Sequence, residues 1–252
     1  MAANPDSTTY GNNLEVWVEE WQNNSMTYVW YLDTTTIYNK EPGIFYSPKQ
    51  VLYRFHADTL YQNAEYRLFI KNNITGKLIS STTTLVHSFS VSKPTSLQQI
   101  NLTATNSLEV KWFSGVNGKL YQLVIRFSYW EKDIPANDSI IRTLDWSLGS
   151  YKSEGIAGGE EMIAAYNGQN FYKFLHDNIE YDPDKVRNAT GFPLEFIFSV
   201  ASDDFNTYME VNAPSTGINQ EKPEYTNISN GIGVFSSRVQ VIRSNYLNAN
   251  SM

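Results

Sequence analysis

The sequence predicts a mostly β protein made of two β-sandwich units of the immunoglobulin or fibronectin-III type, with one short helix inserted in the second. Aromatic residues are abundant, with 17 Tyr, 13 Phe and 6 Trp among 252 residues, and aromatic side chains favour strands. Short segments of alternating apolar and polar residues recur along the chain, separated by segments rich in Asn, Ser and Gly that favour turns. A single segment shows helical spacing instead.

The length allows two modest domains. We expect residues 1–11 to form a disordered tether, residues 12–91 the first β-sandwich domain and residues 96–244 the second. Residues 245–252 are expected to form a disordered tail. The linker is Ser92-Lys93-Pro94-Thr95, in which proline restricts the backbone of the junction.

The first domain reads as two hairpins and one further strand. Alternation predicts strands at residues 14–22, 26–32, 50–57, 65–71 and 77–84. In the first of these strands, Leu14, Val16 and Val18 share one face. The other face carries Glu15, Trp17, Glu19 and Trp21.

In the second domain, strands are predicted at residues 100–104, 108–112, 120–130, 140–148, 194–200 and 232–241. A Trp in the second of these strands is typical of a fibronectin-III-like sandwich. The apolar residues of segment 168–179 have helical spacing, with Asn170 as the expected N-cap and Asp182-Pro183 as the stop. An extension of this helix back through residues 160–165 is an alternative that Asn167-Gly168 interrupts.

Charge and composition exclude several classes of function. The net charge of −7 disfavours binding to nucleic acid, and no run of Lys or Arg suggests an anionic membrane surface. The chain has no cysteine, which excludes disulfides, thiolate metal sites and cysteine nucleophiles. No segment has about 18 consecutive apolar residues, so no membrane-spanning helix is expected. The polar start fits a processed secreted chain as well as a cytosolic one.

The segment from Pro223 to Ser237 contains Thr226-Asn227-Ile228-Ser229-Asn230-Gly231-Ile232-Gly233-Val234-Phe235. This segment resembles the closing signature, Thr/Ser-Asn-Ile-x-x-Gly-x-Gly-x-Phe, of a family of Bacteroidota outer-membrane lipoproteins of uncharacterised function. Weaker likenesses to the strands of that family lie at residues 46–48, 65–68, 117–121 and 126–129.

The resemblance implies a lipid-anchored β-sandwich protein of the cell envelope, on the periplasmic or the surface face, often working beside a TonB-dependent uptake system. The lipidation cysteine and signal peptide do not appear in this sequence, so the anchor follows from the resemblance alone. Physically, Gly231 and Gly233 flank Ile232 and predict a tight entry into the last strand, with Val234 and Phe235 packing inward.

Catalytic and metal-binding patterns are weak. His56, His87 and His176 lack zinc-ligand spacing, and no Gly-x-Ser-x-Gly is present. The acid pairs Glu160-Glu161 and Asp203-Asp204 are adjacent in sequence, so their side chains are expected to point apart rather than across a cleft. Asp182-Pro183-Asp184 and Asp203-Asp204 read as turn or helix-stop residues, with a calcium loop as the alternative. We expect no catalytic residue, no metal and no cofactor.

The candidate ligand-binding residues are Trp17 and Trp21. Exposed on a strand, the two rings would form a platform that stacks on sugars; the alternative is that they pack in the core. The leading functional hypothesis is a non-catalytic binding or accessory subunit of the envelope with an outer-membrane protein as partner. The first alternative is a carbohydrate-binding module with a glycan ligand. The second is a hydrolase with sequence-distant carboxylates of raised pKa.

Overall fold

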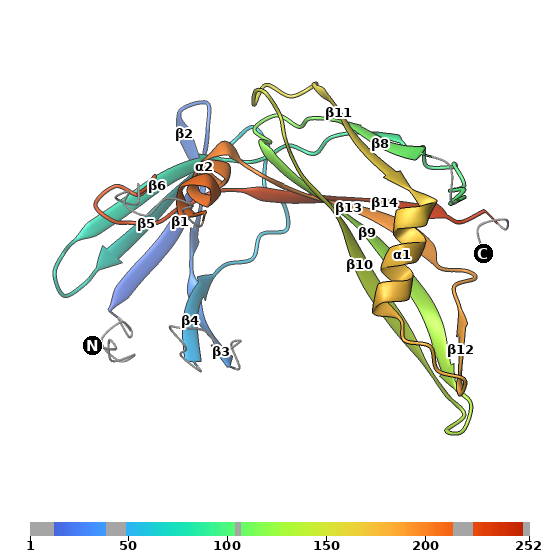
Figure 1. Ribbon diagram of the computed structural model, residues 1–252. Coiled ribbons are helices and arrows are strands. Elements are labelled where there is room, and N and C mark those ends of the chain that lie inside the picture. The colour runs from blue at the N-terminus through green and yellow to red at the C-terminus, as the bar shows by residue number, and fades with distance from the viewer. Residues whose placement is uncertain (1–12, 39–48, 104–106, 214–223, 249–252) are drawn as a thin grey trace, which may run out of the picture. The chain divides into compact units, whose positions relative to one another are not determined.

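The computed structural model describes residues 13–38, 49–103, 107–213 and 224–248. These residues form fourteen strands and two helices, and every strand pairing within the sheets is antiparallel (Figure 1). The mostly β prediction is therefore confirmed. The predicted tether lies outside the described residues.

The chain divides into two compact units, each made of discontinuous segments. The first runs up to Leu85 and also contains Thr207–Ser237, and the second contains Val86–Asn206 and the residues from Arg238. Residues 207–237, which the prediction placed in the second domain, thus belong to the first unit. The expected linker is partly a strand of the second unit, because β7 spans Val91–Lys93. The predicted tail is ordered as far as described, with Asn245 in a strand and Leu247 buried.

A four-stranded sheet organises the first unit, in the order β2-β1-β5-β6. Its strands are β1 (Leu14–Gln22), β2 (Ser25–Tyr31), β5 (Glu65–Asn72) and β6 (Leu78–Thr84), as predicted. The β1–β2 hairpin turns on Asn23 and Asn24, with φ of 51° and 62°. Two consecutive residues with positive φ are typical of the turn whose twist suits a two-residue hairpin.

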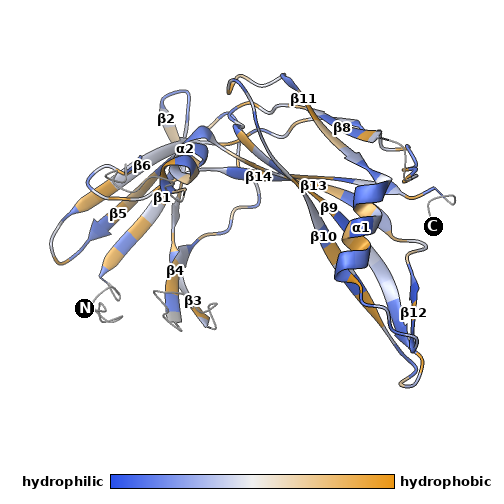
Figure 2. Cartoon of the chain, viewed as in Figure 1, coloured by the Kyte–Doolittle hydropathy of each residue, from blue (hydrophilic) through white to orange (hydrophobic). Residues whose placement is uncertain are grey.

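Hydropathy alternates along the first part of β1 (Figure 2). The burial of alternate residues separates the two faces of this sheet as predicted. Val16 and Val18 are buried. The core on this face also contains Ala64 and Tyr66, with partly buried Trp30, Leu32, Phe55, Leu68, Leu85 and Phe235 around them. A second sheet pairs β3 (Asp33–Tyr38), which was not predicted, with β4 (Lys49–Arg54).

The closing signature is a loop of the first unit and not the entry into a strand, because the last strand, β14 (Arg238–Tyr246), begins only after it. Thr226 Oγ1 accepts hydrogen bonds from the backbone N–H groups of Ile228 and Gly233, both at 3.1 Å. The Asn227 side chain accepts from the Phe235 N–H at 2.9 Å and donates to its carbonyl at 2.8 Å. The side chains supply the partners that a sheet would otherwise give to this backbone.

The glycines of the signature serve the same loop. A Cβ on Gly231 would lie 3.0 Å from Ile228 Cγ2 and 3.3 Å from Ile79 Cγ2, and Gly233 has a φ of +142°. The loop therefore packs closely on β6, and Phe235 reaches the core. Phe235 packs inward as predicted, although it does so from a loop.

The second unit contains a five-stranded and a three-stranded sheet. The larger has the order β10-β9-β13-β14, with β12 beside β9, and the smaller has the order β11-β8-β7. The strands are β8 (Ser107–Phe113), β9 (Leu120–Asp133), β10 (Asp138–Lys152), β11 (Glu161–Asn167), β12 (Lys185–Asn188) and β13 (Pro193–Ala201). Trp112, Tyr121, Phe171, Phe196 and Phe198 are fully buried in its core.

In the second unit, the structure rules out the alternative of a longer helix and does not contain one predicted strand. Residues 160–165 do not extend the helix; most of them lie in β11, where Met162, Ala164 and Tyr166 are buried and alternate with exposed residues. Of the strand predicted at residues 100–104, the described residues 100–103 form no strand, and Ile100 makes an isolated bridge with Leu247.

Helix α1 (Gly168–Asn178) matches the predicted helix, but its N-cap is Asn167 and not Asn170. The Asn167 side chain accepts a hydrogen bond from the Asn170 N–H at 2.8 Å, so Asn170 is the donor in the capping contact. Phe171 packs against Phe127 and Trp146. A second helix, α2 (Asp203–Asn212), was not predicted.

Candidate functional site

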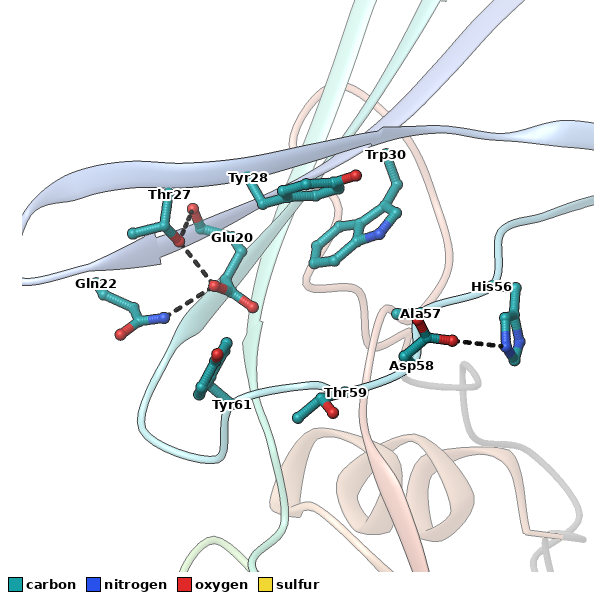
Figure 3. A pocket seen from close by; sticks show the side chains of 10 residues that line it. All are labelled: Glu20, Gln22, Thr27, Tyr28, Trp30, His56, Ala57, Asp58, Thr59 and Tyr61. Atoms are coloured by element: carbon teal, nitrogen blue, oxygen red, sulfur yellow. Dashed lines mark hydrogen bonds and ion pairs between the residues drawn. The ribbon is translucent and has the colours of Figure 1, made fainter.

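A pocket of about 730 Å³ opens in the first unit beside the β1–β2 hairpin (Figure 3). Its walls come from the core-facing side of β1 and β2 and from the segment that precedes β5. The lining residues are Glu20, Gln22, Thr27, Tyr28, Trp30, His56, Ala57, Asp58, Thr59 and Tyr61. This volume suits a small molecule, since ligand pockets usually measure about 300 to 1,000 Å³.

Glu20 is the most buried charged residue of the pocket, with 3% of its surface exposed. It lies on the face of β1 that carries Val16 and Val18. Glu20 Oε1 accepts hydrogen bonds from Thr27 Oγ1 at 2.7 Å and from Gln22 Nε2 at 2.8 Å. Glu20 Oε2 accepts from the Tyr66 hydroxyl at 3.0 Å. The carboxylate is thus fixed by neutral donors, and Figure 3 shows it pointing into the space between the strands and Tyr61.

These contacts decide the ionisation of Glu20. Burial raises the pKa of its carboxyl, but hydrogen bonds from Thr27, Gln22 and Tyr66 outweigh burial and bring the pKa below its ordinary value. The pKa of Tyr66 is raised, by burial and by its hydrogen bond to the Glu20 carboxylate. Glu20 is therefore a carboxylate at neutral pH, and Tyr66 is its neutral donor.

Three aromatic rings line the pocket. Tyr28 and Tyr61 are each 57% exposed, and Trp30 is partly buried. The Tyr28 and Trp30 rings lie 4.7 Å apart with an interplanar angle of 48°, and Trp30 rests on Phe55 at 5.1 Å. Because Tyr28 pairs with Glu20 across the sheet, the ring and the carboxylate share one face.

The rim of the pocket is polar. His56 Nε2 lies 3.6 Å from Asp58 Oδ1, and both side chains are exposed. Thr59 adds a hydroxyl to the same segment. The pocket therefore combines aromatic surfaces with a few fixed polar groups, the arrangement typical of small-molecule sites.

The predicted site residues, Trp17 and Trp21, lie on the opposite face of β1 and do not line this pocket. Their indole N–H groups donate to the two carboxylate oxygens of Glu19, at 3.1 and 2.8 Å. Trp17 stacks on Phe69 at 5.1 Å, and the Arg67 guanidinium lies 3.9 Å from the centre of the Trp21 ring. Both Trp residues are partly exposed, so they form a second, separate aromatic surface.

Sequence reasoning missed the pocket, although one signal marked it. Along the core-facing side of β1, the series Leu14, Val16, Val18 is followed by Glu20. A charged residue in a buried series is rare unless it has a partner or a function. The contributions of Tyr61 and Asp58 depend on tertiary structure and leave no comparable mark in the sequence.

The other candidates have structural roles. Asp182 accepts a hydrogen bond from the Asp184 N–H at 3.0 Å and pairs with Lys185 at 3.5 Å, which explains it as a turn residue. Asp203 and Asp204 occupy the first turn of α2, where the helix dipole favours acidic side chains. In the described residues, no three His, Asp or Glu side chains gather as a metal site.

The described helices include none with the length and apolar character needed to cross a bilayer. A comparison of the sequence with known proteins finds no matching family model and no matching curated protein. The pocket geometry is accordingly the main guide to function.

Proposed function

We propose that the protein is a non-catalytic binding subunit whose ligand site is the pocket of the first unit. The observation that carries this proposal is the combination of a fixed, buried carboxylate with three aromatic rings around a 730 Å³ space. Such a site holds and orients a ligand through apolar faces and a few polar groups. In this proposal the two units are β-sandwiches of the immunoglobulin or fibronectin-III type.

The lowered pKa of Glu20 argues against a role for this residue as the general acid of a hydrolase. A hydrolase with two carboxylates needs a general acid of raised pKa. Two carboxylates, Glu20 and Asp58, do line the pocket. Glu20, however, has a lowered pKa, so it is poorly suited to donate a proton at neutral pH.

The experiment is a thermal-shift screen of sugars, amines, nucleosides and organic acids against the wild type and Ala57→Trp. Ala57 lines the pocket, and an indole there would fill part of it. We expect at least one compound class to raise the melting temperature of the wild type but not of the filled variant. If no compound distinguishes the two proteins, the pocket is not a ligand site.

The cellular setting that we propose is the bacterial envelope, with a lipid anchor and an outer-membrane protein as partner. This part rests on the resemblance of the closing signature. The corresponding experiment is capture from native envelope membranes with this chain as bait. Recovery of one outer-membrane β-barrel supports an accessory subunit, and recovery of none argues against that setting.

A second candidate function is carbohydrate binding through the surface of Trp17 and Trp21. It is favoured by the way Glu19 and Arg67 hold the two rings in place, since fixed aromatic rings lose little entropy on stacking. A glycan array is the screen. We expect Trp17→Ala and Trp21→Ala to abolish any sugar affinity, whereas Trp130→Ala, at an exposed Trp of the second unit, leaves it unchanged.

A further inference from the structure

We propose that the pocket of the first unit binds an organic cation, with its ammonium group held between the Glu20 carboxylate and the rings of Tyr28, Trp30 and Tyr61. This inference rests on the proposed function, because it names the chemical class of ligand for the same pocket. Four features of the pocket support it.

The first feature is that Glu20 has a buried charge but no cationic partner among the described residues. Its hydrogen-bond donors, Thr27, Gln22 and Tyr66, are all neutral. Buried carboxylates are normally paired with a cation, because an isolated charge away from water is costly. An ammonium group in the pocket would supply the missing partner.

Glu131, in the second unit, is a similarly buried glutamate whose charged neighbours can be compared with those of Glu20. It is 6% exposed, against 3% for Glu20. Glu131 is surrounded by Arg142 at 3.2 Å, Arg187 at 2.9 Å and Lys185 at 3.8 Å. Similar burial thus comes with three cations around Glu131 and with none around Glu20 among the described residues.

The second feature is the aromatic wall. Cations are attracted to the faces of Trp and Tyr rings, and the attraction grows when the site excludes water. Tyr28 and Trp30 come from one strand, and Tyr61 comes from the segment before β5, so the rings approach the space from two sides (Figure 3). Three such rings beside a carboxylate form a cage suited to an ammonium group.

The third feature is the charge of the whole lining. Of the ten residues, Glu20 and Asp58 are acidic, none is Lys or Arg, and His56 is paired with Asp58. The pocket therefore repels organic acids and phosphates. The net charge of the chain, −7, adds a weak general attraction for cations.

The fourth feature separates an organic cation from a metal ion. Calcium needs six to eight oxygen ligands and magnesium a near-octahedral set. The described residues contain no cluster of three acidic or His side chains, and the Glu20 oxygens are already hydrogen-bonded. Rings and one carboxylate suit a larger, weakly hydrated cation.

The test compares two ligands of nearly equal shape, choline and its uncharged carbon analogue 3,3-dimethylbutan-1-ol, by titration calorimetry on the full chain. We expect choline to bind about tenfold more tightly, an effect between those of exposed and fully desolvated cation–π contacts. Ethanolamine and putrescine form a second arm, which decides between quaternary and primary ammonium groups. Equal affinity for choline and its neutral analogue, with no binding of the primary amines, overturns the inference.

Variants give an independent reading. Glu20→Gln keeps the shape but removes the charge, and we expect it to weaken cation binding about tenfold or more. The matched control is Glu15→Gln, on the other face of the same strand, which should change nothing. Tyr61→Leu removes an exposed ring of the pocket and should also weaken cation binding. This variant tests the inference if Glu20→Gln fails to fold.

Two failures are distinguishable. If a neutral ligand binds the wild type but not Ala57→Trp, and no amine binds, the pocket is a ligand site and only the inferred class is wrong. If neither amines nor neutral compounds bind, both the inferred ligand class and the proposed function are wrong.

Discussion

Individual side chains replace regular structure at the closing signature. Thr226 and Asn227 provide hydrogen-bond partners for the backbone of a loop that joins β6 through an isolated bridge at Ser229 but forms no strand. The sequence pattern indicated that the glycines matter for backbone geometry, and this is confirmed at Gly233. The roles of Thr226 and Asn227 could not be predicted, because their partners lie seven and eight residues away.

At the same scale, we expect Asn227→Ala to lower the free energy of unfolding by about 1 to 3 kcal/mol, because it leaves the backbone groups of Phe235 unpaired beside the core. Urea unfolding measures this. Asn178→Ala, which removes one exposed side-chain bond to the Phe174 carbonyl, should change stability by less than about 0.5 kcal/mol. Similar losses in both variants would contradict the structural role of Asn227.

Alternation identified the faces of the first strand but not its function. Val16 and Val18 were correctly placed together on one face, and Trp17 and Trp21 on the other. The pocket was missed because the prediction considered the outward aromatic residues and passed over Glu20. The partners of Glu20 across the sheet, Tyr28 and Tyr66, follow only from the strand register.

Long strands were predicted better than short strands and better than the second helix. Most strands longer than six residues showed clear alternation, whereas β3, β7 and β12 are short and depend on their neighbours for pairing. Residues 161–167 fit a strand by alternation, and the nearby helical spacing obscured this. Polar α2 has little apolar periodicity to detect.

The capping assignment gives a prediction for α1. Asn167→Ala should lower the free energy of unfolding by about 1 kcal/mol, as is usual for the loss of an N-cap. Asn170→Ala keeps the backbone N–H that takes part in the cap and should have a much smaller effect. Thermal unfolding of the two variants measures the difference, and the reverse order would restore Asn170 as the cap.

Glu131 joins three strands, since it lies on β9 and pairs with Arg142 on β10 and with Lys185 and Arg187 on β12. The pKa of Glu131 is lowered chiefly by its hydrogen bond from Arg187, while burial opposes the shift. A lowered pKa in the folded state means that stability is present above the unfolded pKa, about 4.3. This stability is lost as pH falls through the folded pKa.

We therefore expect the urea midpoint of the wild type to fall as the pH decreases below about 4.5. Glu131→Gln should be less stable than the wild type at pH 7 and should lose less on acidification. Glu161→Gln, at an exposed acid of β11, is the control and should follow the wild type. Parallel pH curves for Glu131→Gln and the wild type would exclude this contribution.

For the whole molecule, the sequence predicted two units but not that each is discontinuous. The break after Leu85 lies a few residues before the predicted boundary, and the proline that suggested this boundary, Pro94, lies within the second unit. The return of residues 207–237 to the first unit depends on contacts such as Ser81 Oγ with the Asn227 carbonyl at 2.8 Å. Contacts between segments this distant in sequence leave no local pattern.

The first unit should consequently not fold from its N-terminal segment alone. We expect residues 12–91 alone to unfold without cooperativity, because the fragment lacks Phe235 over its core. Residues 13–85 joined by a Gly-Ser linker to 207–237 should regain a cooperative transition, measured by near-UV circular dichroism in urea. Cooperative unfolding of the shorter fragment would show that the returning segment is dispensable.

The two-residue turn at Asn23 and Asn24 also bears on how this protein could diverge. Side chains alternate along β2, so one inserted residue would exchange its faces. Tyr28 and Trp30 would leave the pocket, and Val29 and Tyr31 would enter it. A descendant could keep every aromatic residue and still lose the pocket through one codon added to the hairpin. When related sequences are compared, the length of this turn should therefore indicate whether the pocket is kept better than the presence of Trp30 does.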